Sequence, residues 1–532
     1  MTKDFQPISA VLSKILEELN LSAWVGSPGS RNAPLMEAFS SLECPNAVIL
    51  DERSAGYFAL GVSIKSQMPV ALVSTSGTAA LNYAPAVAEA FYQRIPLLVI
   101  TADRPKKLID NGHGQSVRQE KIYEGHIRAS ALLDPEISIQ ENIDRVTQAL
   151  YHLKNGPVHI NVPIKEPLYG KPIFNENISI KLDKTLEPGS NDNFFFPDWL
   201  GAAKYPLLII GQWNPLWGEI NHLVEKIKSK GWLVTGEHLS QLSSTAVINL
   251  DNGWRSLDDI VLDAVVTIGG AWVSKKSKFR LKGVRHMHIG PSSPHPDMFG
   301  NLKYVLESSY KDGLESLIKH TPVIDKTWTN KWVSKNVSKT EKWSDLWVHE
   351  AISNFGLNNW DIHWANSSSV RYGIHTWAAG GWANNEKHYS NRGTSGIDGC
   401  TSTAVGSAWI SNKRTILITG DLAFFYDSNA FLNREVPEGF KVVVINNRGG
   451  DIFRRLPMAG DSELYDTHYL WKHNHSVKKL VSYAGLEYFY AASIDDWENV
   501  WLDFIESRKS SVLEVFTDSN INDRMWNDRF QQ

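Results

Sequence analysis

Short apolar runs that alternate with stretches of helical periodicity constrain this chain more than any other feature. Over residues 20–170 these runs include "AVILD", "PVALVST", "PLLVITADRP" and "GPVHINVP". Each has the length of a buried strand and is separated from the next by a segment that fits a helix. Alternation of this kind is typical of βαβ units whose parallel sheet is covered by helices on both faces. The sequence therefore predicts an α/β fold of the doubly wound type.

The alternation recurs in later parts of the chain, which predicts more than one domain. The 532 residues are several times the ~100–150 residues of a usual domain. A polar, turn-rich stretch at 171–200 and a lysine- and tryptophan-rich stretch before 342 interrupt the pattern. We expect three doubly wound α/β domains with mainly parallel sheets, over residues 1–175, 195–325 and 342–532. The central, Rossmann-like domain has no G-x-G-x-x-G motif, so nothing in it requires a dinucleotide.

Charge and cysteine content exclude several classes of function. The net charge of -4, from 54 basic and 58 acidic residues, gives no basic field for nucleic acid. The two cysteines, Cys44 and Cys400, lie too far apart for a zinc or disulfide motif and fit a reducing cytoplasm. No apolar run reaches the ~18–20 residues that span a bilayer. We expect a cytoplasmic protein with no nucleic-acid partner and no membrane span.

Polar residues follow two apolar runs in the third block. Gly420 and Asp421 come directly after "TILIT", and Asn446 and Asn447 end the next run, "KVVVINN". Ligands of open α/β sheets bind at the carboxyl ends of the strands, where helix N-termini favour anions. A carboxylate and an amide oxygen at that edge are hard ligands for Mg²⁺ holding a diphosphate. The alternative is structural, with Asp421 as a helix cap and the two asparagines as turn formers.

This pair of motifs resembles the cofactor motif of enzymes that use thiamine diphosphate (ThDP). The resemblance implies that Asp421, Asn447 and the main-chain carbonyl of Gly449 hold Mg²⁺ or Mn²⁺. It also implies that Gly420 and Ile452 contact the cofactor. Two positions depart from the usual pattern, because Leu422 follows Asp421 and Arg448 stands between the two later ligands. We expect Arg448 to point away from the cation.

A cofactor of this kind also needs a carboxylic acid beside its pyrimidine ring. Glu52 follows the run "AVILD" in the first domain and precedes a helical stretch. We expect it to be buried beside apolar neighbours and to act as the activating acid. Alternatively, Glu52 belongs to a solvated helix start. The Gly77 turn in "STSGTAALN" resembles a cofactor-contacting segment, and a small-residue helix packed closely on the sheet explains it equally well.

Further segments in the first and third blocks resemble one family of ThDP enzymes. They include "GSPGSRNAPL", "LIDNGHGQSVRQ", "SNRGTSGIDG" and "NNRGGDIFRRLP". The family is the 2-succinyl-5-enolpyruvyl-6-hydroxy-3-cyclohexene-1-carboxylate synthases of menaquinone biosynthesis. The resemblance implies a transferase that decarboxylates 2-oxoglutarate and adds the succinyl carbanion equivalent to isochorismate in a 1,4 sense.

Both substrates are dianions, which calls for several guanidinium groups. Any one arginine in such a set could instead form a surface ion pair. By resemblance, the residues that contact substrate or intermediate are Ser30, Arg31, Arg104, Gln115, Ser367, Arg371 and Arg392. Ile397 would support the bent cofactor, and Lys275 would reach isochorismate. Lys276 fits that last role equally well by charge, and either lysine could simply be solvated.

The resemblance further implies a homodimer or a dimer of dimers whose cofactor bridges two subunits. Two other interpretations remain open at this point. One is a different ThDP enzyme, such as an acetolactate synthase or a 2-oxoacid decarboxylase, for which this arginine set would be unusual. The other is a scaffold or regulatory protein that kept the fold and lost the chemistry. Intact Glu52, Asp421 and Asn447 count against the second.

Overall fold

The fold is described from a computed structural model. The structure describes residues 5–175, 195–243, 249–253, 261–291, 296–332, 339–379, 385–455 and 462–530, and the single residues 180, 247, 294 and 382. Most of the predicted linker at 171–200 lies outside these residues. The chain divides into two compact units. One comprises Met1–Glu187, Gly393–Asn412 and Tyr426–Phe440, and the other Pro188–Arg392, Lys413–Phe425 and Lys441–Gln532.

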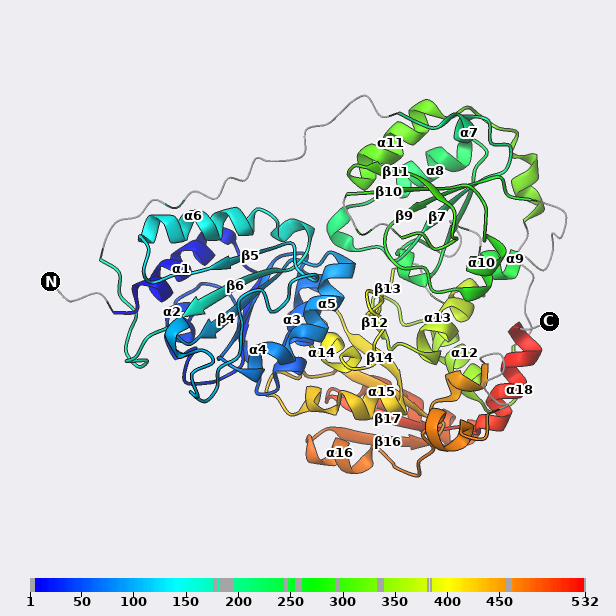
Figure 1. Cartoon of the computed structure of the whole chain (residues 1–532). Helices are drawn as coiled ribbons and strands as arrows, with labels where there is room; N and C mark the ends of the chain where they lie inside the picture. Colours follow the sequence, from blue (N-terminus) through cyan, green and yellow to red (C-terminus); the bar gives the residue numbers. More distant parts are fainter. Residues whose placement is uncertain are drawn as a thin grey trace. The chain divides into compact units, whose positions relative to one another are not determined.

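The first unit is built around a six-stranded parallel sheet in the order β2-β1-β3-β4-β6-β5. Its strands are β1 (Ala23–Gly26), β2 (Asn46–Val48), β3 (Val70–Ser74), β4 (Leu97–Asp103), β5 (Ala129–Leu132) and β6 (Val158–Pro163). The helices α1 (Pro7–Leu19), α2 (Ala33–Phe39) and α6 (Ile139–Leu150) share one apolar core with the sheet. The helices α3 (Glu52–Ser66), α4 (Thr78–Asn82) and α5 (Ala84–Gln93) complete this half of the chain (Figure 1).

A later segment joins the first unit through a close helix contact. Helix α14 (Cys400–Ile410) packs against α3 at two glycines. A Cβ atom at Gly61 would lie 2.0 Å from the carbonyl oxygen of Thr403, and one at Gly406 would lie 2.0 Å from that of Phe58. Only glycine allows the two backbones to approach this closely. This contact explains why residues 393–412 group with the first sheet.

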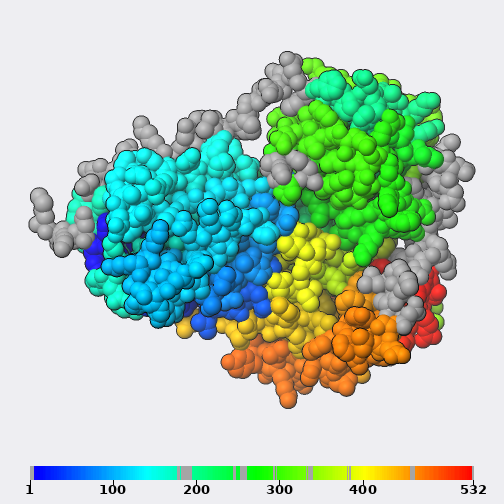
Figure 2. Space-filling model, viewed as in Figure 1, coloured from blue at the N-terminus to red at the C-terminus, as the bar shows by residue number. Residues whose placement is uncertain are grey.

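The second unit holds a five-stranded parallel sheet in the order β11-β10-β9-β7-β8. Its strands are β7 (Pro206–Ile210), β8 (Leu233–Gly236), β9 (Ala264–Ile268), β10 (His286–Gly290) and β11 (Leu302–Glu307). Its helices are α7 (Asp198–Gly201), α8 (Asn221–Ser229), α9 (Leu250–Gly253), α10 (Lys275–Arg280) and α11 (Tyr310–His320). Figure 2 shows the outer face of this segment in green.

The same unit holds a six-stranded parallel sheet in the order β13-β12-β14-β15-β17-β16. The strands are β12 (Asp361–Trp364), β13 (Lys387–Tyr389), β14 (Thr415–Gly420), β15 (Lys441–Asn446), β16 (Glu487–Ala491) and β17 (Ser511–Phe516). The remaining helices are α12 (Asp345–Phe355), α13 (Ser368–Ala378), α15 (Asp421–Tyr426), α16 (Lys478–Tyr483), α17 (Ile494–Glu506) and α18 (Ser519–Phe530). This strand order repeats that of the first sheet.

The observed architecture confirms the predicted fold class. Every strand pair in the three sheets is parallel, and helices alternate with strands along the chain. Within the described ranges, no helix is both long and apolar enough to cross a membrane. The three domain ranges drawn from the sequence stay a prediction, because the compact units follow a different division of the chain.

Candidate active site

Four adjacent strand ends of the first sheet carry residues expected at a site. Ser30 and Arg31 follow β1, Glu52 follows β2, Gly77 follows β3 and Arg104 follows β4. These strands lie side by side in the sheet, and all are parallel. Their carboxyl ends therefore meet at one edge, where open α/β sheets bind ligands.

Glu52 is the first residue of α3 and is half-buried. The preceding residue, Asp51, caps the helix, since its Oδ1 accepts a hydrogen bond of 3.1 Å from the backbone N–H of Ser54. Among the described residues, the Glu52 carboxylate accepts one hydrogen bond, a long one of 3.5 Å from Nδ2 of Asn82. Burial of Glu52 was expected from its apolar neighbours, but within the chain described here it is only partial. Its place in the first turn of α3 leaves one side open.

Gly77 lies in a turn with a positive φ that is held by a glutamine far along the chain. Its φ is +89°, which favours glycine, and a Cβ there would lie 3.2 Å from Cα of Gln115. The Gly77 N–H donates to Oε1 of Gln119 at 2.8 Å, and Nε2 of Gln119 donates to the Ala102 carbonyl at 3.0 Å. Gln119 is fully buried, whereas Gln115 is exposed with a φ of +53°. Gln119 thus ties the ends of β3 and β4 together.

The two arginines at this edge are already engaged by the protein. Arg31 is buried, donates to the carbonyl of Ile164 at 3.0 Å and pairs with Glu166 at 3.2 Å. Arg104 is half-buried and donates from Nε to the carbonyl of Gly114 at 2.7 Å. Ser30 is exposed. The structure brings these residues to one edge and fixes both guanidinium groups there.

The predicted cation site lies where β14 and β15 end. These strands are neighbours, with Gly420 opposite Ile445. Oδ1 of Asp421 accepts from the N–H of Leu422 at 2.7 Å, and its Oδ2 accepts from the N–H of Gly449 at 3.1 Å. Oδ2 also lies 3.0 Å from Nε2 of His473. Asp421 is therefore the first residue of α15, not the cap that the structural alternative expected, and it also binds the turn that contains Gly449.

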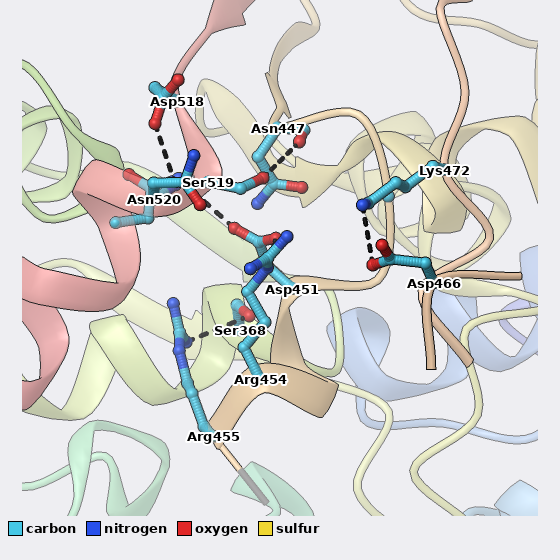
Figure 3. Close-up of polar contacts among 12 residues, drawn as sticks. Ser368, Asn447, Asp451, Arg454, Arg455, Asp466, Lys472, Asp518, Ser519 and Asn520 are labelled. Carbon is cyan, nitrogen blue, oxygen red and sulfur yellow. Dashed lines mark hydrogen bonds and ion pairs between the residues drawn. The ribbon is translucent and has the colours of Figure 1, made fainter. Parts of the chain in front are cut away.

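Two hydrogen bonds hold Asn447, and neither of them uses its side-chain oxygen. Its Nδ2 donates to Oδ2 of Asp345 at 3.1 Å, and its carbonyl oxygen accepts from Oγ of Ser519 at 2.8 Å. Figure 3 shows Ser519 between Asn447 and Asp451. The side-chain oxygen Oδ1 of Asn447 is buried and has no hydrogen-bond partner among the described residues. A buried acceptor without a partner costs free energy unless a ligand satisfies it.

The donor set at this point fits a magnesium ion and a diphosphate. It combines the Asp421 carboxylate, the Asn447 amide oxygen and the Gly449 carbonyl, all of them hard oxygens. A Cβ at Gly420 would meet no atom within 4 Å, so its backbone is open to an approaching anion. Within the described ranges, no three His, Cys, Asp or Glu side chains group as a metal site. The site would therefore rest on one charged ligand and neutral oxygens.

Arg448 and Ile452 flank this site. Arg448 is exposed and has a φ of +64°. Its guanidinium carbon lies 5.9 Å from the ring centroid of Phe516. Ile452 is half-buried in the 3₁₀ turn Asp451–Arg455.

In the first unit, Ile397 is half-buried and directly precedes Asp398, whose Oδ2 accepts from the hydroxyl of Tyr57 at 3.0 Å.

A cluster of cations forms in the second unit beside the third sheet. Arg371 lies in α13 and donates to the Ser367 carbonyl, and Arg392 follows β13 and donates to Oδ1 of Asn366 at 2.8 Å. Burial, followed by the charges of Arg392 and Arg455, lowers the pKa of Arg371 to about 10. The two arginines predicted from separate loops are thus close enough for their positive charges to repel each other. Such repulsion favours binding of an anion.

A lysine that sequence reasoning missed belongs to this cluster. Lys278 is half-buried in α10, and its pKa is lowered by burial and by the charges of Arg392 and Arg371, against an opposing effect of Glu237. By contrast, Lys275 is exposed. Lys275 and Lys278 are three residues apart in one helix, so they share a face. That spacing was the signal that could have found Lys278.

Glu237 fixes the start of the segment that carries these lysines. Its two carboxylate oxygens accept from the N–H groups of Val273 and Ser274 at 2.8 and 2.7 Å. Burial raises the pKa of Glu237 to about 7. The next residue, His238, packs on α13, since a Cβ at Gly373 would lie 3.0 Å from its Nε2. The second and third sheets of this unit therefore meet beside Arg371.

The chain is similar to known proteins both in sequence and in fold. Residues 7–122 match the family model described as "Thiamine pyrophosphate enzyme, N-terminal TPP binding domain". Among solved structures, the chain is similar to benzoylformate decarboxylase from Polynucleobacter necessarius, with a TM-score of 0.71 and 15% identity over 97% of this chain and 99% of that chain. At this identity the likeness shows the fold alone.

Relatives with higher identity carry one name. The 2-succinyl-5-enolpyruvyl-6-hydroxy-3-cyclohexene-1-carboxylate synthase of Flavobacterium psychrophilum is 36% identical over 97% of both chains. Those of Flavobacterium johnsoniae and Desulfotalea psychrophila are 35% and 32% identical, over 95% and 93% of this chain and 95% and 96% of theirs. These matches run through all three sheets. The chain therefore belongs to the 2-succinyl-5-enolpyruvyl-6-hydroxy-3-cyclohexene-1-carboxylate synthase family of thiamine-diphosphate-dependent enzymes.

Proposed function

We propose that the chain decarboxylates 2-oxoglutarate and joins the remaining succinyl unit to isochorismate in menaquinone biosynthesis. The observation that carries this proposal is the clustering of Arg371, Arg392 and Lys278, which suits substrates with several carboxylates. Charge-assisted pairs to carboxylates are among the stronger polar contacts in proteins. A decarboxylase for a monoanionic 2-oxoacid would have less use for three cations in one place.

The cofactor and the protein divide the chemistry. When bound, thiamine diphosphate supplies the electron sink that permits loss of CO₂ and formation of the new carbon–carbon bond. Glu52 would share a proton with the pyrimidine ring of the cofactor. The backbone of Gly77 lies at the same edge of the first sheet as Glu52 and would contact the cofactor there. Ile397 would support the cofactor by apolar contact.

A divalent cation would hold the diphosphate to the second unit. Asp421, Asn447 and the carbonyl of Gly449 would bind Mg²⁺ or Mn²⁺. The open backbone of Gly420 and the side chain of Ile452 would contact the cofactor nearby. The buried, unpartnered Oδ1 of Asn447 supports this assignment, since a cation would satisfy it.

Substrate carboxylates would be bound by the residues that the family resemblance implies. These are Ser30, Arg31, Arg104 and Gln115 of the first sheet, and Ser367, Arg371, Arg392 and Lys275 of the second unit. The protein would neutralise charge, orient the two substrates and exclude water. Because the charges of both arginines act on Lys278, we add this lysine to the set.

We also propose a cytoplasmic homodimer or dimer of dimers, in which Glu52 of one subunit serves the cofactor of another. Mixing inactive Glu52→Gln and Asp421→Ala subunits tests this. Random exchange would return up to about a quarter of wild-type activity, because half of the dimers would each regain one intact site. No regain after verified subunit exchange would show that each subunit works alone.

One assay tests the activity itself. Protein, ThDP, Mg²⁺, 2-oxoglutarate and isochorismate are mixed, and isochorismate loss and product mass are followed. Consumption of both substrates with a single coupled product supports the proposal. Loss of CO₂ from 2-oxoglutarate with isochorismate untouched would instead favour a simple 2-oxoacid decarboxylase.

A further inference from the structure

Asp345 is a fully buried carboxylate that is not among the proposed ligands of the cation, the cofactor or the substrates. It is the first residue of α12, far in sequence from both asparagines of the cation site. Its Oδ1 accepts from Oγ1 of Thr517 at 2.6 Å and from Nδ2 of Asn522 at 2.9 Å. Its Oδ2 accepts from Nδ2 of Asn447 at 3.1 Å. Three donors thus surround one acid, and one of them belongs to a proposed metal ligand.

The chemistry of an amide makes this contact directional. An asparagine side chain offers NH₂ at one end and oxygen at the other, and only the oxygen binds a cation. An ionised carboxylate only accepts hydrogen bonds, so it holds the NH₂ end and repels the oxygen. The bond from Asn447 to Asp345 therefore leaves Oδ1 at the opposite end, where it is buried without a described partner.

The backbone of Asn447 is fixed as well. Its carbonyl oxygen accepts from Oγ of Ser519 at 2.8 Å, and Ser519 also hydrogen-bonds Asp451 (Figure 3). With the backbone and the NH₂ group both held, rotation of the amide would break a charge-assisted bond inside the protein. We propose that Asp345 is a positioning residue that presents Oδ1 of Asn447 to the divalent cation. The inference rests on the proposed cation site.

The surroundings of Asp345 predict what an isosteric replacement would do. In Asp345→Asn, the Thr517 and Asn522 donors require an acceptor, so the new amide oxygen stays on their side. The new NH₂ group would then face Asn447, whose amide would rotate so that its oxygen accepts from that group. Asn447 would present NH₂ to the cation, and metal affinity would fall by roughly 10- to 100-fold.

A second substitution should reverse this loss. Asp345→Asn with Asn447→Asp places a carboxylate at 447, which has an oxygen at both ends. One oxygen accepts from the new amide and the other faces the cation, and the pair keeps its net charge. Asn447→Asp alone puts two carboxylates in contact, and a cation relieves their repulsion, so it should bind the cation at least as tightly as the double variant.

Mn²⁺ binding measured by electron paramagnetic resonance, with ThDP present and no substrate, tests the inference. We expect weak binding for Asp345→Asn, and recovery to within a factor of a few for the double variant. Unchanged affinity in Asp345→Asn, or no recovery in the double variant, would overturn it. If Asp345→Asn does not fold, Asp345→Ala takes its place, because it removes the acceptor that holds the Asn447 amide, and wild-type affinity in that variant overturns the inference.

Two controls separate this inference from its premise. Asn447→Ala removes the ligand itself and should bind Mn²⁺ at least as poorly as Asp345→Asn. Wild-type affinity in Asn447→Ala would show that the cation site is wrong, whatever Asp345 does. Thr517→Val removes one bond to Asp345 without touching Asn447, and it should lower thermal stability more than Mn²⁺ affinity.

Discussion

Nε2 of His473 lies 3.0 Å from Oδ2 of Asp421, and both side chains are buried. The ring of His473 stacks on that of His475, with centroids 5.5 Å apart and an angle of 15° between the planes. The ring of Phe425 packs against that of His473 at an angle of 85°, with centroids 5.4 Å apart. His473 is therefore held by its neighbours and in turn fixes the carboxylate of Asp421.

This relationship predicts that His473 supports cation binding without contacting the cofactor. His473→Ala should weaken Mg²⁺-dependent ThDP binding by about 10-fold or more, because Asp421 loses an outer partner. Asp421→Ala should weaken it further. Isothermal titration with ThDP at limiting Mg²⁺ measures both. The matched control is His475→Ala, which removes the stacking partner and should leave ThDP affinity near wild type. An equal loss of ThDP affinity in the two histidine variants would mean that His473 serves packing alone.

Glu52→Gln should lower turnover by roughly 10²- to 10⁴-fold, because an amide cannot exchange the proton that activates the cofactor. ThDP affinity should hardly change, since the cofactor would be anchored at Asp421 and Asn447. Steady-state rates and ThDP titration check the two halves. Asp51→Ala is the control, because it removes the cap of α3 and a hydrogen bond of 2.6 Å from Asn429, and it should cost about 1 kcal/mol of stability or more with little effect on turnover. Turnover of Glu52→Gln within 10-fold of wild type would be incompatible with its role as the activating acid.

Arg392→Ala and Lys278→Met should each remove a charge-assisted pair to substrate. The expected loss in kcat/KM is roughly 10- to 150-fold, which corresponds to about 1.5–3 kcal/mol. Lys275→Met should cost less, because Lys275 is exposed. The losses should shrink when an ester analogue replaces a charged substrate. Equal losses for charged and uncharged substrates would mean that these cations serve the fold.

Asp427 predicts a pH dependence of stability. Its carboxylate accepts from the N–H and the hydroxyl of Ser402 at 2.6 and 2.7 Å, and burial raises its pKa from 3.8 to about 7. Between these values the folded chain keeps a proton that the unfolded chain has lost, so stability falls as pH rises from about 4 to 7. Asp427→Asn lacks this penalty, and its stability relative to wild type should increase by up to roughly 4 kcal/mol over that range.

Thermal midpoints of Asp427→Asn and wild type at pH 4.5 and pH 8 test this sign. The difference should favour the variant more strongly at the higher pH. Ser402→Ala is the control, because it removes a contact without adding or removing a titrating group. A difference between Asp427→Asn and wild type that stays constant with pH would contradict the raised pKa.

Sequence reasoning located residues that follow strands, because the pattern of apolar runs shows where each strand ends. Gly420, Asp421 and Asn447 were found in this way, and β14 and β15 are indeed neighbours. The same reasoning predicted the α/β class and parallel sheets. It also named Arg371 and Arg392, which the fold brings into one electrostatic cluster. Their roles at a site stay predictions.

Contacts between distant segments could not be predicted. Asp345 meets Asn447, and His473 meets Asp421, through packing that no local pattern encodes. Glu52 is half-buried within the described chain, because apolar neighbours in sequence do not enclose the first turn of a helix. Residues 393–412 pack with the first sheet through glycine contacts between α3 and α14, which the division into consecutive domains did not foresee.

The most direct test of the account traces carbon from uniformly ¹³C-labelled 2-oxoglutarate in the presence of unlabelled isochorismate, ThDP and Mg²⁺. The account predicts one labelled CO₂ for each product molecule and a product that carries the four remaining labelled carbons joined to the isochorismate skeleton. Chelation of the cation should stop both. Labelled CO₂ without label in any isochorismate-derived product, or faster coupling with pyruvate than with 2-oxoglutarate, would contradict it.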